Sequence, residues 1–316
     1  MKFEPDYWVE LEQNYFHAMA ARQALFKKHG DRVFFHLPGS ELACRELMEM
    51  LLQFLVHRYP QYFCLTDDNT ILHNQLLNTV SHLTTTHPLR VIFDNIPEDY
   101  ALMLRNESDG TYYLRAAMVC SSVGWDIAQH IGSPLRSIHA EVPDASKMAF
   151  SMDRFFARMP TDQPIQRCSW SIEDWEALFS SPQVVADWQR SAFAKDPGSL
   201  RPDDLKLRCD WQTLRRLPLS GSIAFNFKAV FTPLEELREE PFVPALLRTV
   251  LGEGKRNLID YKSVEHTRNV AMEALGKWAE EQVSSGVVPP DWEARTLDES
   301  PFYPGWEEKW HAKQGF

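Results

Sequence analysis

The stretch between residues 205 and 231 constrains the fold most, because apolar and polar side chains alternate along it with the period of a β-strand. Leu205, Leu207 and Cys209 alternate with charged residues. After a turn at 219–222, apolar side chains recur at every second position from Ile223 to Phe231. Alternation of this kind puts one face of each strand against a core. The pattern therefore predicts an antiparallel hairpin that belongs to a larger sheet.

A second hairpin is predicted between residues 101 and 119, where two β-like runs flank a turn rich in Asn, Ser, Asp and Gly. Val91-Ile92-Phe93 adds a short strand candidate. Apolar residues at helical spacing predict helices over residues 10–28, 40–59 and 263–284. Without a repeat or a Gly/Ser linker, we expect a single α+β domain over residues 1–316. It comprises a helical region 1–90, an antiparallel sheet at about 91–231, a helical region 232–288 and an extended tail 289–316.

Short polar signals predict further helix starts between and after the hairpins. Ser171 is interpreted as an N-cap, because Trp170 and Trp175 have the spacing of a hydrophobic staple. Ser181-Pro182 and Thr232-Pro233 have the same Ser/Thr-Pro form that opens many helices. We therefore expect one helix to begin at each of these three positions.

The charge balance excludes several classes of partner. Lys and Arg total 33 and Asp and Glu total 44, so the formal net charge is 33 − 44 = −11. A nucleic-acid-binding or anionic-membrane surface is expected to be basic, so we predict neither partner. No window approaches the roughly 20 apolar residues of a membrane span, and the N-terminus lacks the apolar segment of a signal peptide.

The cysteine pattern indicates reduced thiols. Five cysteines are scattered without a C-x-x-C pair: Cys44, Cys64, Cys120, Cys168 and Cys209. Zinc ribbons and cysteine-ligated iron–sulfur clusters need paired cysteines, so neither is expected in this chain. An odd number at long spacing favours a cytoplasmic location.

Several common catalytic motifs do not occur. The sequence has no G-x-G-x-x-G after a strand, no G-x-x-x-x-G-K-S/T, no G-x-S-x-G and no H-E-x-x-H. His82 and His87 are five residues apart and do not share a helix face, so we interpret them as surface polar residues rather than as a ligand pair.

Helix-start signals and a candidate ligand histidine are concentrated between Trp125 and Phe156. Ser133-Pro134 predicts the start of a short helix that Pro143 ends, and a second helix is predicted over residues 146–159. His139 lies near the end of the first helix. A histidine there is either a capping or packed residue, which suits the negative end of a helix, or an axial metal or haem ligand. Periodicity alone does not choose between these two roles.

Four arginines are open to two interpretations each. Arg215 and Arg216 are successive residues of a predicted strand, so their side chains point to opposite faces and at most one serves a given pocket. A guanidinium binds a carboxylate such as a cofactor propionate bidentately, or pairs with one of the many acidic side chains. Arg154 and Arg208 carry the same two alternatives. The high aromatic content, with ten Trp and nineteen Phe, suits a flat cofactor or simply a large core.

An ordered set of segments makes the chain recognisable. In order, these are GSELACRELMEMLLQFLVHRYPQYF, IPEDYALM, IGSPLRSIHAEVP, KMAFSMDRFF, QRCSWSI and LKLRCDWQTLRRLPLSGSIAFNFKAVFTPL. Together they resemble the family of the haem-dependent oxidative N-demethylase alpha subunit, also called the HRQ family. The resemblance runs from about residue 38 to residue 262.

The resemblance implies a PAS-like antiparallel sheet that holds haem b, with flanking N- and C-terminal helices. It implies a haem-binding oxidoreductase that demethylates a small secondary amine with oxygen and releases formaldehyde. Electrons would come from NADPH through flavin and iron–sulfur centres on separate reductase subunits. Carried over residue by residue, His139 in IHAEVP is the expected haem ligand, and the expected pocket or propionate residues are Trp125, Arg154, Arg208, Arg215 and Arg216.

Ligation of haem by an imidazole is consistent with this sequence, since the sequence contains no signature of a thiolate-ligated haem. The chain departs from the family motif around Val142-Pro143. Glu141 stands where the family usually has a Pro before the Val-Pro, and Asp144-Ala145 stand where an aromatic residue usually follows it. Asp99, Glu141 and Asp144 are acidic residues that can attract a cationic amine, or are solvated surface. Two alternatives to the demethylase remain: a PAS-like haem or ligand sensor without turnover, and a structural domain that has lost haem.

Overall fold

A computed structural model gives the fold as two compact units. It describes residues 3, 5, 8–175, 178–180, 183–185, 187, 200–262, 265–294 and 304–314. Unit 1 comprises Met1–Arg167, Trp211–Lys228 and His311–Phe316, and unit 2 comprises Cys168–Asp210 and Ala229–Trp310. The single domain over residues 1–316 stays a prediction, and the two units are described here one at a time.

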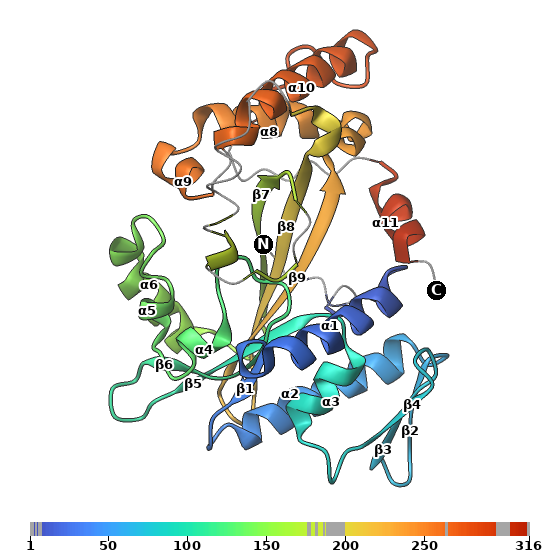
Figure 1. Ribbon diagram of the computed structural model, residues 1–316, viewed down its shortest axis with the longest axis vertical. Helices are drawn as coiled ribbons and strands as arrows, with labels where there is room; N and C mark the ends of the chain where they lie inside the picture. The colour runs from blue at the N-terminus through green and yellow to red at the C-terminus, as the bar shows by residue number, and fades with distance from the viewer. Residues whose placement is uncertain are drawn as a thin grey trace. The chain divides into compact units, whose positions relative to one another are not determined.

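A six-stranded sheet is the main β structure, with strand order β1-β6-β5-β9-β8-β7 (Figure 1). Its strands are β1 (Phe34–His36), β5 (Asp99–Arg105), β6 (Tyr112–Met118), β7 (Ile165–Glu173), β8 (Lys206–Arg216) and β9 (Ile223–Pro233). Strand β5 lies antiparallel to both β6 and β9, with Tyr100 opposite Met118 and Asn226. Both predicted hairpins are thereby confirmed, and so is the mixed α+β class.

Unit 1 contains three helices that precede the central strands in the sequence. They are α1 (Tyr15–His29), α2 (Glu41–Arg58) and α3 (Pro88–Asn95), and a 3-10 turn, η2 (Gly30–Arg32), follows α1. Between α2 and α3 lies a separate three-stranded sheet of β2 (Phe63–Thr66), β3 (Ile71–Asn74) and β4 (Thr79–His82). The sequence predicted a helical region over residues 1–90, and this prediction is wrong in part, because the region also contains β1 and the three-stranded sheet.

The strand predicted at Val91-Ile92-Phe93 is wrong, because these residues lie inside α3. Pro88 occupies the first turn of this helix, and the His87 side chain accepts a hydrogen bond from the Leu89 backbone N–H. All three residues are fully buried, so the run shows no helical alternation of apolar and polar residues.

Two helices were predicted in the corner between Trp125 and Phe156, and the structure has three. These are α4 (Ile127–His130), α5 (Leu135–Ile138) and α6 (Ala145–Arg158). The second predicted helix is confirmed as α6, whereas the first ends at Ile138 rather than at Pro143, and α4 was not predicted. Pro134 itself is the N-cap residue of α5, and Ser133 makes no capping hydrogen bond. Helix α5 is a single turn, so His139 follows directly at its C-terminal end.

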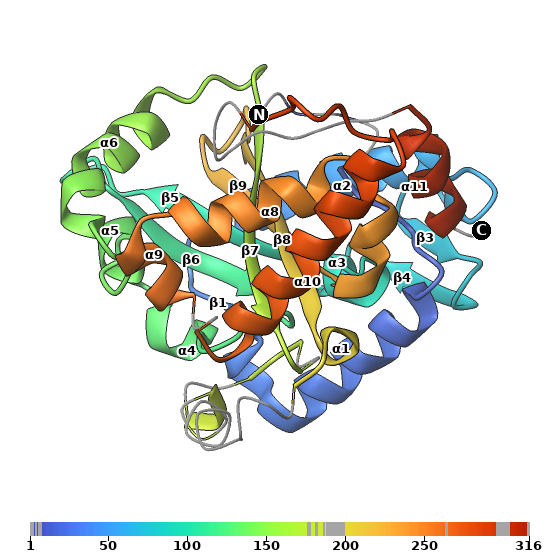
Figure 2. The same cartoon turned by 90° about the horizontal axis from the view of Figure 1, so that it is seen from above.

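Unit 2 is mainly helical. It contains η4 (Pro202–Asp204), η5 (Leu234–Glu239), α8 (Val243–Glu253), α9 (Arg256–Tyr261) and α10 (Glu265–Ser284), and α11 (Trp306–Gln314) begins in it. Helices α8 and α10 lie side by side in both views (Figure 2). Their contact is apolar and includes Leu247, Leu251, Leu275 and Trp278.

Three local predictions in this part of the chain need correction. Ser171 does not start a helix, because β7 continues through Glu173. Thr232 and Pro233 still belong to β9, and the 3-10 segment η5 follows them rather than an α-helix. The tail also contains the helix α11, although its sequence lacks an amphipathic period. The helix predicted from Ser181 falls largely outside the described residues.

Each helix that the structure describes is either too short or too polar to serve as a membrane span.

Candidate functional site

One face of the main sheet in unit 1 carries a row of short and aromatic side chains. Ala101 of β5 lies opposite Ala117 of β6 on one side and Phe225 of β9 on the other. Phe35 of β1 lies opposite Ala117 and extends the row. Directly opposed residues of neighbouring strands project to the same face. The two alanines therefore leave a flat, apolar centre with an aromatic ring at each end.

The three helices α4, α5 and α6 pack on this face. Their buried residues Ile127, Leu135 and Phe156 form one apolar cluster with Ala101 and Ala117. The half-buried residues Phe225, Phe227, Trp125 and Ile138 border the cluster. We call this region the sheet-face cluster. The Phe225 and Phe227 rings lie 5.0 Å apart, so aromatic surface runs along β9.

His139 lies at the edge of the sheet-face cluster, next to Ile138. Its Nδ1 atom lies 3.0 Å from the backbone oxygen of Leu135, one turn earlier. A carbonyl oxygen only accepts, so the neutral ring carries its proton on Nδ1 and keeps a lone pair on Nε2. This is the tautomer and the backbone restraint that metal-ligating histidines commonly have.

Trp125 and His130 form a stacked pair at the same corner. Their ring centroids are 5.1 Å apart and the planes differ by 10°. Burial lowers the pKa of His130, and the nearby His139 lowers it further, while Asp126 and Glu141 raise it. The two histidines are therefore close enough to interact electrostatically, and the lowered pKa favours the neutral form of His130. Sequence reasoning missed His130, although it lies in the same WDIAQH segment as Trp125.

The two successive arginines of β8 diverge, as predicted. Arg216 donates to the backbone oxygens of Phe156, Met159 (2.6 Å) and Gly221 (2.8 Å), so it ties the end of α6 to the β8–β9 turn. Arg215 instead lies over the Trp8 ring, with its guanidinium carbon 4.3 Å from the ring centroid. At most one of them therefore faces the sheet-face cluster.

The other two predicted arginines have different surroundings. Arg154 is exposed on α6, and no described residue forms a hydrogen bond or ion pair with it. Arg208 belongs to unit 2 and is buried, where it pairs with Asp210 at 3.0 Å and lies over the Phe231 ring. Its guanidinium is thus already matched to a carboxylate.

Arg167 of β7 is a further arginine that sequence reasoning did not single out. Its Nε donates to Gln212 Oε1 at 2.6 Å, and its guanidinium carbon lies 5.4 Å from the Phe225 ring centroid. It therefore continues the row of Ala117, Ala101 and Phe225. Desolvation lowers its pKa, and no carboxylate among the described residues pairs with it. The signal available was its position in the recognised segment QRCSWSI.

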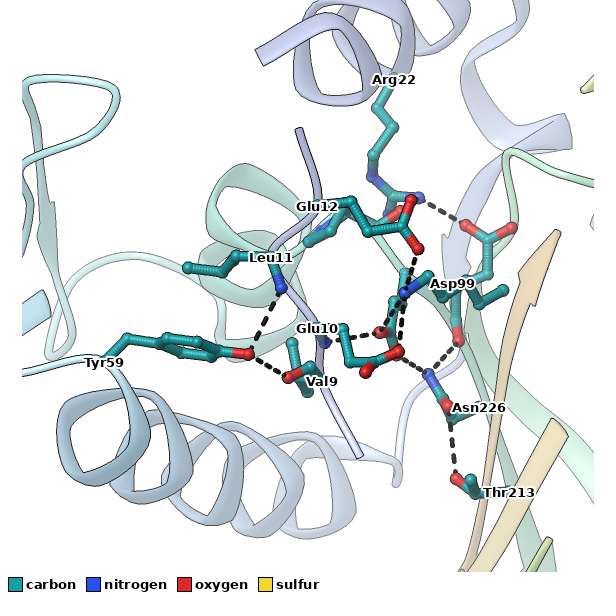
Figure 3. A network of polar contacts seen from close by, with 12 residues as sticks. Val9, Glu10, Leu11, Glu12, Arg22, Tyr59, Asp99, Thr213 and Asn226 are labelled. Carbon is teal, nitrogen blue, oxygen red and sulfur yellow. Dashed lines mark hydrogen bonds and ion pairs between the residues drawn. The ribbon is translucent and has the colours of Figure 1, made fainter. Parts of the chain in front are cut away.

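Most of the acidic residues that were considered for binding a cationic amine already form ion pairs within the protein. Asp99 is 1% exposed, pairs with Arg22 at 2.5 Å and accepts hydrogen bonds from the Cys120 and Ser121 backbone N–H groups. Asp144 pairs with Lys147 at 2.6 Å, whereas Glu141 is exposed. Figure 3 shows that Asp99 belongs to a buried polar network with Arg22 and Asn226. Asp99 therefore has a structural role in this network.

Taken together, these observations define an α+β protein whose main sheet has an apolar, aromatic-lined face beside two histidines. A family model described as haem-dependent oxidative N-demethylase, alpha subunit-like, matches residues 1–272, which is most of the chain. The chain belongs to this family. The resemblance drawn from the ordered sequence segments is thereby confirmed.

Proposed function

We propose that this chain is a haem-binding oxidoreductase that removes a methyl group from a small secondary amine. The observation that carries the proposal is the hydrogen bond between His139 Nδ1 and the Leu135 oxygen. It fixes the imidazole and leaves Nε2 available, so that His139 would hold the haem iron. The family description supplies the haem dependence and the class of reaction.

The surroundings of His139 fit a haem. A porphyrin is flat and apolar except for its propionates, and the sheet-face cluster offers the short side chains of Ala101 and Ala117 flanked by aromatic rings. We propose that the main antiparallel sheet is PAS-like and that the group is haem b. The stacked Trp125–His130 pair would line the same pocket.

Among the arginines, Arg167 and Arg154 are our first choices for the propionates. Neither has a carboxylate partner among the described residues, so each is available to bind one bidentately. Arg216 already serves three backbone oxygens, Arg215 lies over Trp8 and Arg208 pairs with Asp210. These three remain proposed pocket residues of second rank.

The haem would supply oxygen activation, while this chain would hold the iron through His139, orient the substrate and exclude water. His139 needs no thiolate partner for this role, and all five cysteines are free. We propose that flavin and iron–sulfur centres lie on separate reductase chains, as the alpha-subunit description implies further subunits. The isolated chain should then fail to oxidise NADPH; unaided oxidation would contradict the partner scheme.

The test is the ultraviolet–visible spectrum of the chain expressed with a haem precursor. We expect a Soret band that shifts with dithionite and carbon monoxide, and that weakens or changes ligation in His139→Ala. His57→Ala is the matched control, because His57 is exposed on α2. A colourless wild type that also fails to bind added haem would overturn the proposal.

A haem sensor without turnover is the second candidate, and one observation favours it. Asp144-Ala145 stand just after the Val-Pro, where the family motif usually has an aromatic, and Ala145 is a small buried residue at the start of α6. If that aromatic shapes the substrate side, the chain can hold haem without demethylating an amine. Formaldehyde release from a panel of secondary amines, with a supplied electron donor, separates the two: release supports the demethylase, and its absence with intact haem supports the sensor.

A further inference from the structure

Helix α6 has two contrasting faces. Ala145, Met152 and Phe156 recur at helical spacing on the inner face. Ala145 and Phe156 are buried, and Met152 and Phe156 pack in the sheet-face cluster. We call the opposite side of the helix the α6 outer face. It consists of six exposed residues: Lys147, Met148, Phe150, Arg154, Phe155 and Arg158.

The α6 outer face exposes a group of large apolar side chains. Phe150 is 75% exposed, Met148 is 41% exposed and Phe155 is 40% exposed. Met148 and Phe155 are two helical turns apart, so they lie on one side of this face, and Phe150 lies on the other side. Single exposed apolar residues are common in soluble proteins. Three on one helix of 14 residues form a patch of the kind that marks an interaction site.

A basic stripe runs between these apolar side chains. Lys147, Arg154 and Arg158 project in nearly the same direction, because they follow one another at helical spacing. Lys147 pairs with Asp144, whereas no described residue forms a hydrogen bond or an ion pair with Arg158. Asp153, the one carboxylate in the sequence of α6, is already in an ion pair. Helix α6 therefore has a formal charge of 3 − 1 = +2 in a chain whose net charge is −11.

The arrangement of charge and apolar surface favours an acidic protein as the partner. A helix that lies in a membrane surface keeps its apolar residues together on the inserted face and its cations on the opposite face. On the α6 outer face, the cations lie between the apolar residues instead. A second copy of the chain is disfavoured, because symmetric packing of this face on itself would bring like charges together. Aromatic, Met and Arg side chains are the ones enriched in protein–protein interfaces.

We propose that the α6 outer face docks an acidic iron–sulfur subunit that donates electrons. This inference rests on the proposed function, which requires electrons from a separate chain, and the alpha-subunit description of the family implies further subunits. The inner face of α6 contacts the sheet-face cluster through Met152 and Phe156. A subunit docked on the outer face is therefore separated from that cluster by one helix, about 10 Å thick. The basic stripe steers the encounter, and Phe150 supplies an apolar anchor.

The experiment measures binding of an acidic plant-type [2Fe–2S] ferredoxin to the full chain by surface plasmon resonance. For the wild type we expect saturable binding that weakens about tenfold between about 50 and about 300 mM NaCl, because salt screens the paired charges. Phe150→Ser should weaken binding about tenfold, since the apolar anchor is lost. Arg158→Glu should weaken binding about tenfold at the lower salt concentration and remove most of the salt dependence.

Two exposed residues of α2 supply the matched controls. Leu42→Ser removes an exposed apolar side chain and Arg45→Glu reverses an exposed charge, so each should bind ferredoxin within about twofold of the wild type. Arg154 stays unchanged in every variant, because it is also a proposed propionate residue. Circular dichroism checks that each variant is folded.

The Soret band of the same samples reports on haem independently of docking. A colourless chain that still binds ferredoxin through the α6 outer face supports docking and contradicts the haem proposal. A haem-loaded chain that does not bind ferredoxin contradicts the docking proposal alone.

Three further outcomes overturn the docking proposal. The first is that the control variants weaken binding as much as the α6 variants do. The second is a wild-type dimer in light scattering that Arg158→Glu makes monomeric, since the face then belongs to a second copy. The third is sedimentation of the wild type with vesicles of phosphatidylcholine and phosphatidylserine that both α6 variants abolish, since the face then binds a membrane.

Discussion

At the scale of single residues, the structure separates charges that hold the fold from charges that are available to a ligand. Arg216 illustrates the first kind, because all its hydrogen bonds go to backbone oxygens. Arg167 illustrates the second, since it lies beside Phe225 with no carboxylate partner among the described residues. The sequence presents both simply as arginines in strands.

Arg216→Met should destabilise unit 1 by about 2–3 kcal/mol, because two or three backbone oxygens lose a charged donor. Urea unfolding followed by circular dichroism measures this. Arg216→Lys should recover part of the loss, since one ammonium can reach at most some of the three oxygens. If Arg216→Met weakens haem binding without lowering the urea midpoint, Arg216 is instead a propionate ligand.

Glu98 gives a second residue-scale prediction. It is buried beside Lys228, and burial raises its pKa from 4.5 to about 7. The folded state therefore binds the proton more tightly than the unfolded state. Its contribution to stability is complete below pH 4.5 and is lost as pH rises through about 7. Glu98→Gln should flatten this part of the profile in urea unfolding between pH 5 and pH 8. The exposed control Glu49→Gln should keep the wild-type slope, and an unchanged slope in Glu98→Gln would contradict the assignment.

At the scale of elements, His87 has a structural role that needs no metal, because it caps helix α3. The sequence interpretation took His82 and His87 as surface residues, and His82 on β4 is indeed exposed. His87 is half-buried, caps α3 through Nδ1 and stacks on His36 with ring centroids 3.9 Å apart. Its Nδ1 accepts a hydrogen bond, so the neutral form is required for the cap.

His87→Ala should cost about 1 kcal/mol at pH 8, the usual value of a lost helix cap. Burial lowers the pKa of His87, His36 lowers it further and Glu41 opposes them. A lowered histidine pKa means that the unfolded state binds more protons, so this contribution is complete above pH 6.5 and falls as the solution becomes more acid. Thermal unfolding at pH 8 and pH 5 should show a smaller difference from wild type at pH 5. His82→Ala is the control, and an equal loss at both pH values would refute the cap.

At the scale of the whole molecule, the residues of the proposed haem site lie in one of the two units. His139, Trp125 and Arg167 belong to unit 1. Each unit has an apolar cluster of its own. A change in one cluster should therefore affect the chemistry of that unit first.

Leu275→Ala tests this division. Leu275 is fully buried between α8 and α10, and a Leu→Ala change in a core costs about 2–5 kcal/mol. We expect faster hydrogen exchange in α8 and α10, with the haem spectrum of the chain unchanged. Leu114→Ala in the sheet-face cluster is the matched variant and should weaken haem retention. Loss of the Soret band in Leu275→Ala alone would show that the division is wrong.

The sequence by itself determined the elements whose signal is local. The hairpins β5–β6 and β8–β9, the helices α2, α6 and α10, and the family follow from short-range periodicity and from the order of recognisable segments. The opposite faces of Arg215 and Arg216 also follow, because strand geometry fixes them.

Only the tertiary structure decided which residues meet. The helix at Val91-Ile92-Phe93 was missed because all three side chains are buried, which removes the apolar–polar pattern that would reveal a helix. Ser171 lies in β7 because strand pairing prevailed over a local capping signal. The hydrogen bonds of Arg167 with Gln212 and of Asn226 with Glu98 span 45 and 128 residues of sequence. Strand order creates these contacts, and strand order is a property of the folded chain because no local pattern encodes which strands become neighbours.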